Sequence, residues 1–314
     1  MTGRPTEPIL PNRRTFLRAA ALTAVALPLA AACSPGYEES PDPLGPLLRA
    51  AETDAAGARA LTGADAGAAE PVATARAAHA AALKTEVDRL NRPKPEQSGP
   101  AENPSSADGL KERLALARKQ AEDLVPSLPR YRAGMVASIA AGCAALQQSS
   151  DKLGRGDDAG AVEVPAGTSL NQEAAEAVQQ ALAAEHAAIW VYGLVSAYLP
   201  AAFTSAVSRG SAEHVKRRDV CERMLSAAGQ TPTGPEAAYV PPKPVTDGNS
   251  AMEIVATSEA DATSAWLGVI DRTDDAALRK TALNALIGSA RRGTAWRAEF
   301  GAKPVAIAMP GQAV

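Results

Sequence analysis

Three ionisable side chains lie on otherwise apolar helical stripes in the second half of the sequence. Glu185 is spaced three or four residues from Leu182 and Ile189, and Glu259 and His214 have comparable apolar neighbours. Residues with this spacing share one face of a helix. Burying an unpaired charge is unfavourable, so we expect these three groups to meet inside a helical bundle and to pair with a metal, or with one another and an arginine.

The set of candidate ligands is incomplete for a di-iron centre. Such a centre in a four-helix bundle takes a Glu from each of two helices and Glu-x-x-His from each of the other two. Position 211, three residues before His214, is a serine, and residues 283–298 contain neither an acid nor a histidine. The residues therefore favour a structural cluster of Glu185, His214 and Glu259 with Arg218 or Arg291. We expect no cofactor. The alternative is a degenerate site for iron or another divalent metal, and an arginine lying between the carboxylates would rule out this alternative.

The elements that must position these residues are helices. Alanine, the best helix former, is abundant, whereas aromatic residues make up only 4% of the 314 residues, and strands favour aromatic and β-branched side chains. The sequence predicts an all-α fold with helices near residues 44–61, 72–90, 107–125, 130–150, 170–199, 201–228, 250–272 and 275–300.

Proline- and glycine-rich stretches separate these helices into two groups of four. Each group reads helix, helix, proline-rich loop, helix, helix, with the loops at 91–106 and 229–248. Similar residues recur at similar separations in the two groups: the number of residues between Glu52 and Glu185 is close to the number between His79 and His214. The two halves are a divergent duplication or, alternatively, two unrelated helical halves or one continuous bundle. In the first half we expect His79 to be packed or partly exposed, and Glu52, Asp54 and Glu122 to be solvated.

The N-terminus carries the features of an export signal. Arg13 and Arg14 precede an apolar stretch that runs from Ala19 to Ala32, and Cys33 follows at once. This stretch is shorter than the roughly 20 apolar residues that span a bilayer, and the order of basic pair, apolar run and small residues is typical of a removable targeting segment. We expect twin-arginine export, lipidation of Cys33 and attachment to the outer face of the cytoplasmic membrane or the cell envelope.

The chain divides on these grounds into six segments. They are a signal peptide (1–32), a lipid-anchored tether (33–43), an N-terminal helical bundle (44–150), a linker (151–168), a second four-helix bundle (169–301) and a C-terminal tail (302–314). Two further cysteines, Cys143 and Cys221, lie in apolar helical runs; they are either buried thiols or, in an exported protein, a disulfide.

Several short motifs in the second half carry a family resemblance. They lie at 181–193, around Glu185; at 213–219, where His214 is followed by basic residues and an aspartate; at 239–241; and at 291–297. In this order they resemble an uncharacterised ferritin-like domain family of actinobacterial exported lipoproteins. The resemblance covers about residues 170–300. It implies a ferritin-like four-helix bundle and nothing definite about activity.

Other functions find no support in the sequence. The net charge of −3 argues against a nucleic-acid surface, which requires a basic patch. We found no phosphate-binding glycine loop, no Cys-x-x-Cys, no His-Glu-x-x-His and no nucleophile elbow. The sequence therefore predicts a non-enzymatic binding or scaffolding lipoprotein that meets the membrane through Cys33, and the alternative is an iron-binding protein with oxidase-type activity.

Overall fold

Eight α-helices make up the described part of the chain. The structure is a computed structural model, which describes residues 40–90, 92–93, 103–154, 159–167 and 169–312. Arg13, Arg14, Cys33 and the whole predicted signal peptide lie outside these residues. The helices are α2 (Gly45–Ala60), α3 (Ala66–Leu90), α4 (Ala107–Leu124), α5 (Arg130–Ser149), α6 (Gln172–Val195), α7 (Thr204–Ala227), α8 (Gly248–Asp271) and α9 (Ala276–Glu299).

The all-α prediction is confirmed, and the starts of four helices follow from local side-chain chemistry. The side chain of the residue before the helix accepts a hydrogen bond from a backbone N–H of the first turn, which would otherwise lack a partner. These N-cap residues are Ser106, Asn171, Asp247 and Asp275. One boundary differs from expectation: α3 begins at Ala66 rather than near residue 72, because Pro71 is accommodated inside the helix.

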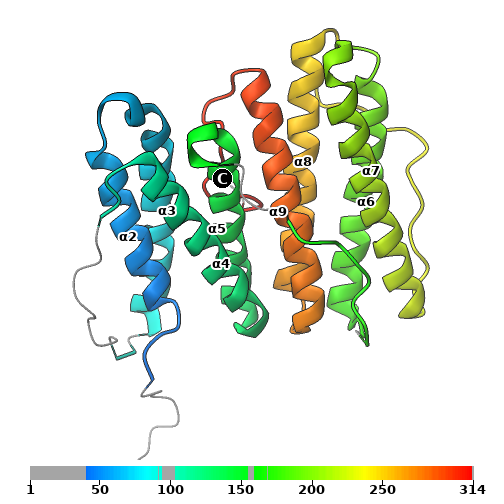
Figure 1. The fold of residues 1–314 in the computed structure, drawn as a ribbon. Coiled ribbons are helices and arrows are strands. Elements are labelled where there is room, and N and C mark those ends of the chain that lie inside the picture. Colours follow the sequence, from blue (N-terminus) through cyan, green and yellow to red (C-terminus); the bar gives the residue numbers. More distant parts are fainter. Residues whose placement is uncertain (1–39, 91, 94–102, 155–158, 168, 313–314) are drawn as a thin grey trace, which may run out of the picture. The chain divides into compact units, whose positions relative to one another are not determined.

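The helices pair in the same order in both halves. In the first half α2 packs on α3 and α4 packs on α5, while α2 also contacts α4; in the second, α6 contacts α7 and α8, and α8 packs on α9. The long connection between α7 and α8 runs along the outside of this second set (Figure 1). Within the described ranges, no helix combines the length and hydropathy needed to cross a lipid bilayer.

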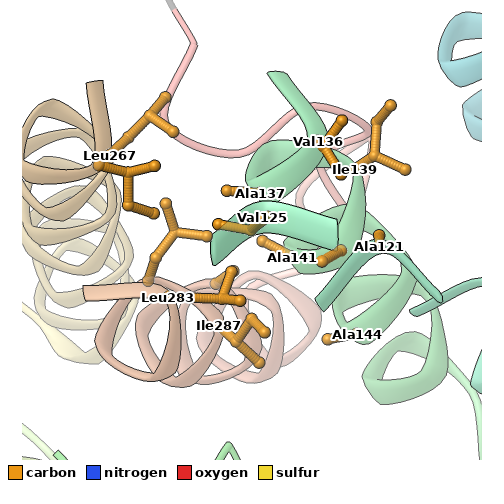
Figure 2. Packing of buried hydrophobic residues seen from close by; sticks show 14 of the residues in the cluster. Ala121, Val125, Val136, Ala137, Ile139, Ala141, Ala144, Leu267, Leu283 and Ile287 are labelled. Atoms are coloured by element: carbon orange, nitrogen blue, oxygen red, sulfur yellow. The ribbon is translucent and has the colours of Figure 1, made fainter. Parts of the chain in front are cut away.

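The two helical sets share a hydrophobic core. Helix α5 contacts both α8 and α9, and the buried cluster is continuous from α2 to α9. Figure 2 shows Ala137 and Ala141 of α5 facing Leu283 and Ile287 of α9, with Leu267 of α8 beside them. The small side chains of α5 allow this close approach, so the alanine-rich helix is the element against which the second set packs.

Two ordered segments at the ends of the described chain are tied to this core. Asp42 is buried, and both its carboxylate oxygens accept from Nη2 of Arg132, at 2.8 and 2.7 Å. Asp42, which the prediction assigned to the tether at 33–43, is therefore held against the helical core. At the other end, the predicted tail returns to α5, where Ser138 Oγ donates to the carbonyl of Pro310 over 2.8 Å.

Cys143 and Cys221 are both free and buried. They lie on α5 and α7, where burial raises the pKa of each thiol, and Cys143 Sγ also accepts from Arg76 Nη1 over 3.6 Å. The disulfide alternative is thus not realised, and both residues are buried thiols.

Candidate functional site

Glu185, His214 and Glu259 meet in the interior of the α6–α9 helical set. Each is completely buried, and the three come from α6, α7 and α8. The imidazole of His214 lies between the two carboxylates: Nδ1 is 2.5 Å from Glu185 Oε2, and Nε2 is 3.2 Å from Glu259 Oε1. Because both ring nitrogens face carboxylate oxygens, the geometry favours a doubly protonated imidazolium that donates one hydrogen bond to each.

The arginine partners differ by one position from those predicted. Arg292 of α9 donates from Nε to Glu259 Oε1 over 2.7 Å and from Nη2 to Oε2 over 3.2 Å. Arg217 of α7 places Nη1 at 4.0 Å from Glu185 Oε1. The predicted Arg218 instead pairs with Asp219 at the surface, over 2.6 Å. Side chains of adjacent residues point about 100° apart around a helix. The prediction was therefore one position off, and it named the outward-facing Arg218 where the inward-facing arginine is Arg217.

The second predicted arginine, Arg291, lines a cavity between α7, α9 and the segment at 159–163. The contact with Glu259 is made by its neighbour Arg292. The cluster is therefore Glu185, His214, Glu259, Arg217 and Arg292, and we refer to these five residues as the interior charge cluster.

Aromatic donors complete the hydrogen bonding of the two carboxylates. Tyr192 donates its hydroxyl to Glu259 Oε1 over 2.7 Å, and Trp266 donates Nε1–H to Glu185 Oε1 over 2.6 Å. Trp296 in turn donates to the Tyr192 hydroxyl over 3.2 Å. The Tyr192 ring fits because position 210 on α7 is a glycine, where a Cβ atom would overlap the ring.

The oppositely charged groups of the cluster keep one another ionised by shifting one another's pKa values. Burial alone raises the pKa of Glu185 and Glu259, but the cationic His214 and the arginines lower both below their usual range. Burial lowers the pKa of His214, and the two carboxylates more than reverse this, so its pKa is raised. At neutral pH the three central groups are thus charged and paired, and Tyr192, whose pKa is raised by burial and by Glu259, stays a protonated donor.

The donor set does not fit a ferritin-type metal centre. The carboxylates of Glu185 and Glu259 already accept hydrogen bonds from His214, Trp266, Tyr192 and Arg292. Helix α9 contributes a guanidinium where a metal site of this kind needs an acid or a histidine. Among the described residues, no group of three or more His, Cys, Asp or Glu side chains is arranged to hold a metal ion.

A second buried polar cluster lies in the first half, where the sequence predicted a packed or partly exposed His79 and a solvated Asp54. Asp54 is only 1% exposed and pairs with Arg76 over 2.9 Å and with Arg113. His79 is also buried: Nδ1 faces Arg76 Nη1 at 3.1 Å and Nε2 faces the carbonyl of Ala308 at 2.7 Å. The expectation for Asp54 was wrong because its helix buries this position against α3 and α4, whereas Glu52 is exposed and Glu122 is half-buried beside Arg118.

His79 and His214 occupy corresponding positions in the two halves of the sequence but differ in protonation: His79 is neutral and His214 is cationic. Burial and the neighbouring Arg76 lower the pKa of His79 to about 3. The neutral ring accepts from Arg76 at Nδ1 and donates from Nε2 to the Ala308 carbonyl. His79 thereby fastens the C-terminal segment to α3, whereas His214 links two carboxylates.

Some residues of this site were not predicted, although their helical spacing indicated two of them. Tyr192 lies seven residues after Glu185, on the same helical stripe, and Arg217 lies three residues after His214. Trp266 and Trp296 are both buried, and a buried indole N–H requires an acceptor. Trp266 meets this requirement with Glu185 of α6 and Trp296 meets it with the Tyr192 hydroxyl, so neither acceptor follows from the spacing along the tryptophan's own helix.

Comparisons with known proteins match the second helical set to a family of unknown function. Residues 177–314 match the model of a domain of unknown function, DUF4439. A solved structure of a conserved hypothetical protein, rv2844, from Mycobacterium tuberculosis is 36% identical, with 44% of this chain and 97% of that one covered and a TM-score of 0.40. No curated protein matches. The C-terminal half of the chain therefore belongs to the DUF4439 family, which agrees with the predicted uncharacterised family.

Proposed function

We propose that the chain is an exported, lipid-anchored protein of the cell envelope whose helical part acts by binding or scaffolding rather than by catalysis. We further propose that its α6–α9 set is a ferritin-like bundle without a working di-iron centre. The twin arginines and Cys33 support the export and anchoring parts. The order of helices, with one long connection between the second and third, supports the ferritin-like part.

One observation carries the non-enzymatic part of the proposal. The imidazole of His214 has a carboxylate at each nitrogen, and the guanidinium of Arg292 covers one of those carboxylates. A metal ligand must present a free lone pair, and a general acid or base must reach a substrate. His214 and the two carboxylates are fully buried, Arg292 is 22% exposed, and all four are engaged with one another, so the arrangement favours a structural role.

Iron loading tests this proposal against the oxidase alternative. Purified protein, incubated with iron(II) under argon and passed through a desalting column, should retain less than stoichiometric iron. Oxygen and peroxide consumption should equal that of a protein-free iron control, because the carboxylates already have cationic partners. Retention of one or more iron ions per chain, together with oxygen consumption that Glu185→Gln abolishes, would establish the oxidase alternative instead.

Export is tested separately from the interior chemistry. Changing Arg13→Lys together with Arg14→Lys should leave the protein in the cytoplasm, because the pair is the recognition element of this type of signal. Cell fractionation with immunodetection measures the result. Arg18→Lys is the matched control, since it changes a nearby basic residue outside the pair and should leave delivery unchanged. Normal envelope delivery of the double variant would refute the twin-arginine assignment.

A further inference from the structure

A cavity of about 880 Å³ lies beside the interior charge cluster, between α7, α9 and the segment at 159–163. Sites for small organic molecules have volumes of about 300–1,000 Å³, and a free phosphate ion would fill only a small part of this space. Glycine and alanine residues, whose small size leaves this space open, form part of the wall. The cavity therefore has room for an organic molecule with a polar group at one end.

Basic side chains dominate the charge of this cavity. The five basic lining residues are Arg209, Lys216, Arg217, Arg291 and Arg292, and the two acidic ones are Glu163 and Glu213. Glu213 is also paired with Lys216, over 2.8 Å. The lining thus has an excess of three positive charges, which would attract an anion and repel a cation.

Arg217 links the cavity to the interior charge cluster. It is only 2% exposed; Nη1 donates to Ser289 Oγ over 2.7 Å, while Nε is buried without a hydrogen-bond partner among the described residues. A Cβ atom at Gly288 would overlap Nη2 of Arg217, so the glycine leaves space for the guanidinium at the cavity wall. Buried donors without a partner are rare in folded proteins, and this one lies on a residue that lines the cavity.

The interior charge cluster is not neutral when Arg217 is included. His214, Arg217 and Arg292 are three cations, and Glu185 and Glu259 are two carboxylates. Burial and repulsion from Arg292 lower the pKa of Arg217 to about 10, which leaves it charged at neutral pH. One positive charge therefore lacks an internal counter-ion, and the cavity is the adjacent space in which an anion would supply it.

We propose that this cavity binds a small organic molecule through a phosphate group, with Arg217 and Arg292 at the inner end and Arg209 and Lys216 nearer the solvent. Guanidinium groups match phosphate oxygens with paired, charge-assisted hydrogen bonds. With His214, Glu185 and Glu259 counted beside the lining residues, six cations face four carboxylates, and the two negative charges of a phosphate ester match the two positive charges that remain. This inference rests on the proposed binding function and names its ligand class.

Calorimetric titration of the purified chain tests the proposal, with glycerol 3-phosphate and pyrophosphate as phosphate probes and citrate as a carboxylate probe. The phosphate probes should bind saturably at one site per chain. Arg209→Gln with Lys216→Gln should weaken them by about tenfold or more, which is about 1.4 kcal/mol. Both residues are on the surface, so circular dichroism should show an unchanged helical fold.

Lys243→Gln is the matched control, because Lys243 is an exposed lysine paired with Glu253 outside the cavity. This variant should bind as the unchanged protein does. Absence of saturable phosphate binding, tighter binding of citrate than of either phosphate probe, or equal weakening in the Lys243→Gln variant would each overturn the proposal. Phosphorus NMR of the same samples separates the two claims, since turnover of a bound ester would contradict the non-enzymatic function and leave the binding site standing.

Discussion

Replacing Glu259 by glutamine should lower the free energy of unfolding by about 3–5 kcal/mol, the range found when one partner of a buried ion pair is removed. Glu259 accepts from Tyr192, His214 and Arg292 at once. The amide keeps the shape but loses the charge, so the imidazolium and the guanidinium face each other without their shared counter-ion. Urea unfolding followed by circular dichroism measures the change.

Glu253→Gln provides the matched control on the same helix. Glu253 pairs with Lys243, and the two side chains are 46% and 73% exposed. Exposed pairs contribute about 0–1 kcal/mol, so this variant should unfold almost as the unchanged protein does. If Glu259→Gln also stayed within about 1 kcal/mol, the interior charge cluster would not stabilise the fold and its structural role would be refuted.

Acidification from pH 6.5 to 4.5 should remove about 2–3 kcal/mol of stability through His79 alone. The pKa of this histidine is lowered to about 3 in the folded chain, whereas in the unfolded chain it titrates near 6.5. The unfolded state therefore binds a proton in this range and the folded state does not, so stability is complete above pH 6.5 and falls as the pH drops towards 3.

The contributions of His214, Glu185 and Glu259 to stability change outside this interval. The pKa of His214 is raised, so its contribution is lost only as the pH rises above 6.5, towards the folded pKa. Glu185 and Glu259, with lowered pKa values, lose their contributions only below about pH 4.5.

His79→Gln is the variant that isolates the acid effect. The glutamine amide can still donate to the Ala308 carbonyl but does not titrate. Unfolding free energies measured from pH 8 to 4.5 should show a shallower loss for this variant between pH 6.5 and 4.5. Parallel curves for the variant and the unchanged protein would show that His79 is not held neutral in the fold.

The fold was predictable where one physical signal dominated. Alanine content and the scarcity of aromatic residues predicted helices, and the N-cap residues Ser106 and Asp275 lie where the predicted helices begin. Two features were not predictable from periodicity. Pro71 reads as a helix start but lies within α3, and the packing of α5 against α9 depends on alanine faces that give no contrast between a buried and an exposed side.

The cluster was predictable in its acids and histidine but not in its arginines. Glu185, His214 and Glu259 interrupt apolar stripes, which marks them as inward. Arg217 and Arg218 are adjacent, as are Arg291 and Arg292, so composition alone cannot choose between neighbours that point about 100° apart. Asp54 was not predicted to be buried because, unlike the three central residues, it has no large apolar neighbours on its alanine-rich helix to identify its face as the buried one.

The protonation state of His214 tests the central claim most directly. Imidazole nitrogen shifts from ¹H–¹⁵N NMR of the folded protein report which ring nitrogens carry a proton. The geometry predicts that Nδ1 and Nε2 are both protonated at pH 7.5, well above the pKa of a free histidine, with Nδ1–H strongly deshielded by its short contact with Glu185. A neutral ring at pH 7.5, with one nitrogen free to accept, would contradict the interior charge cluster as described.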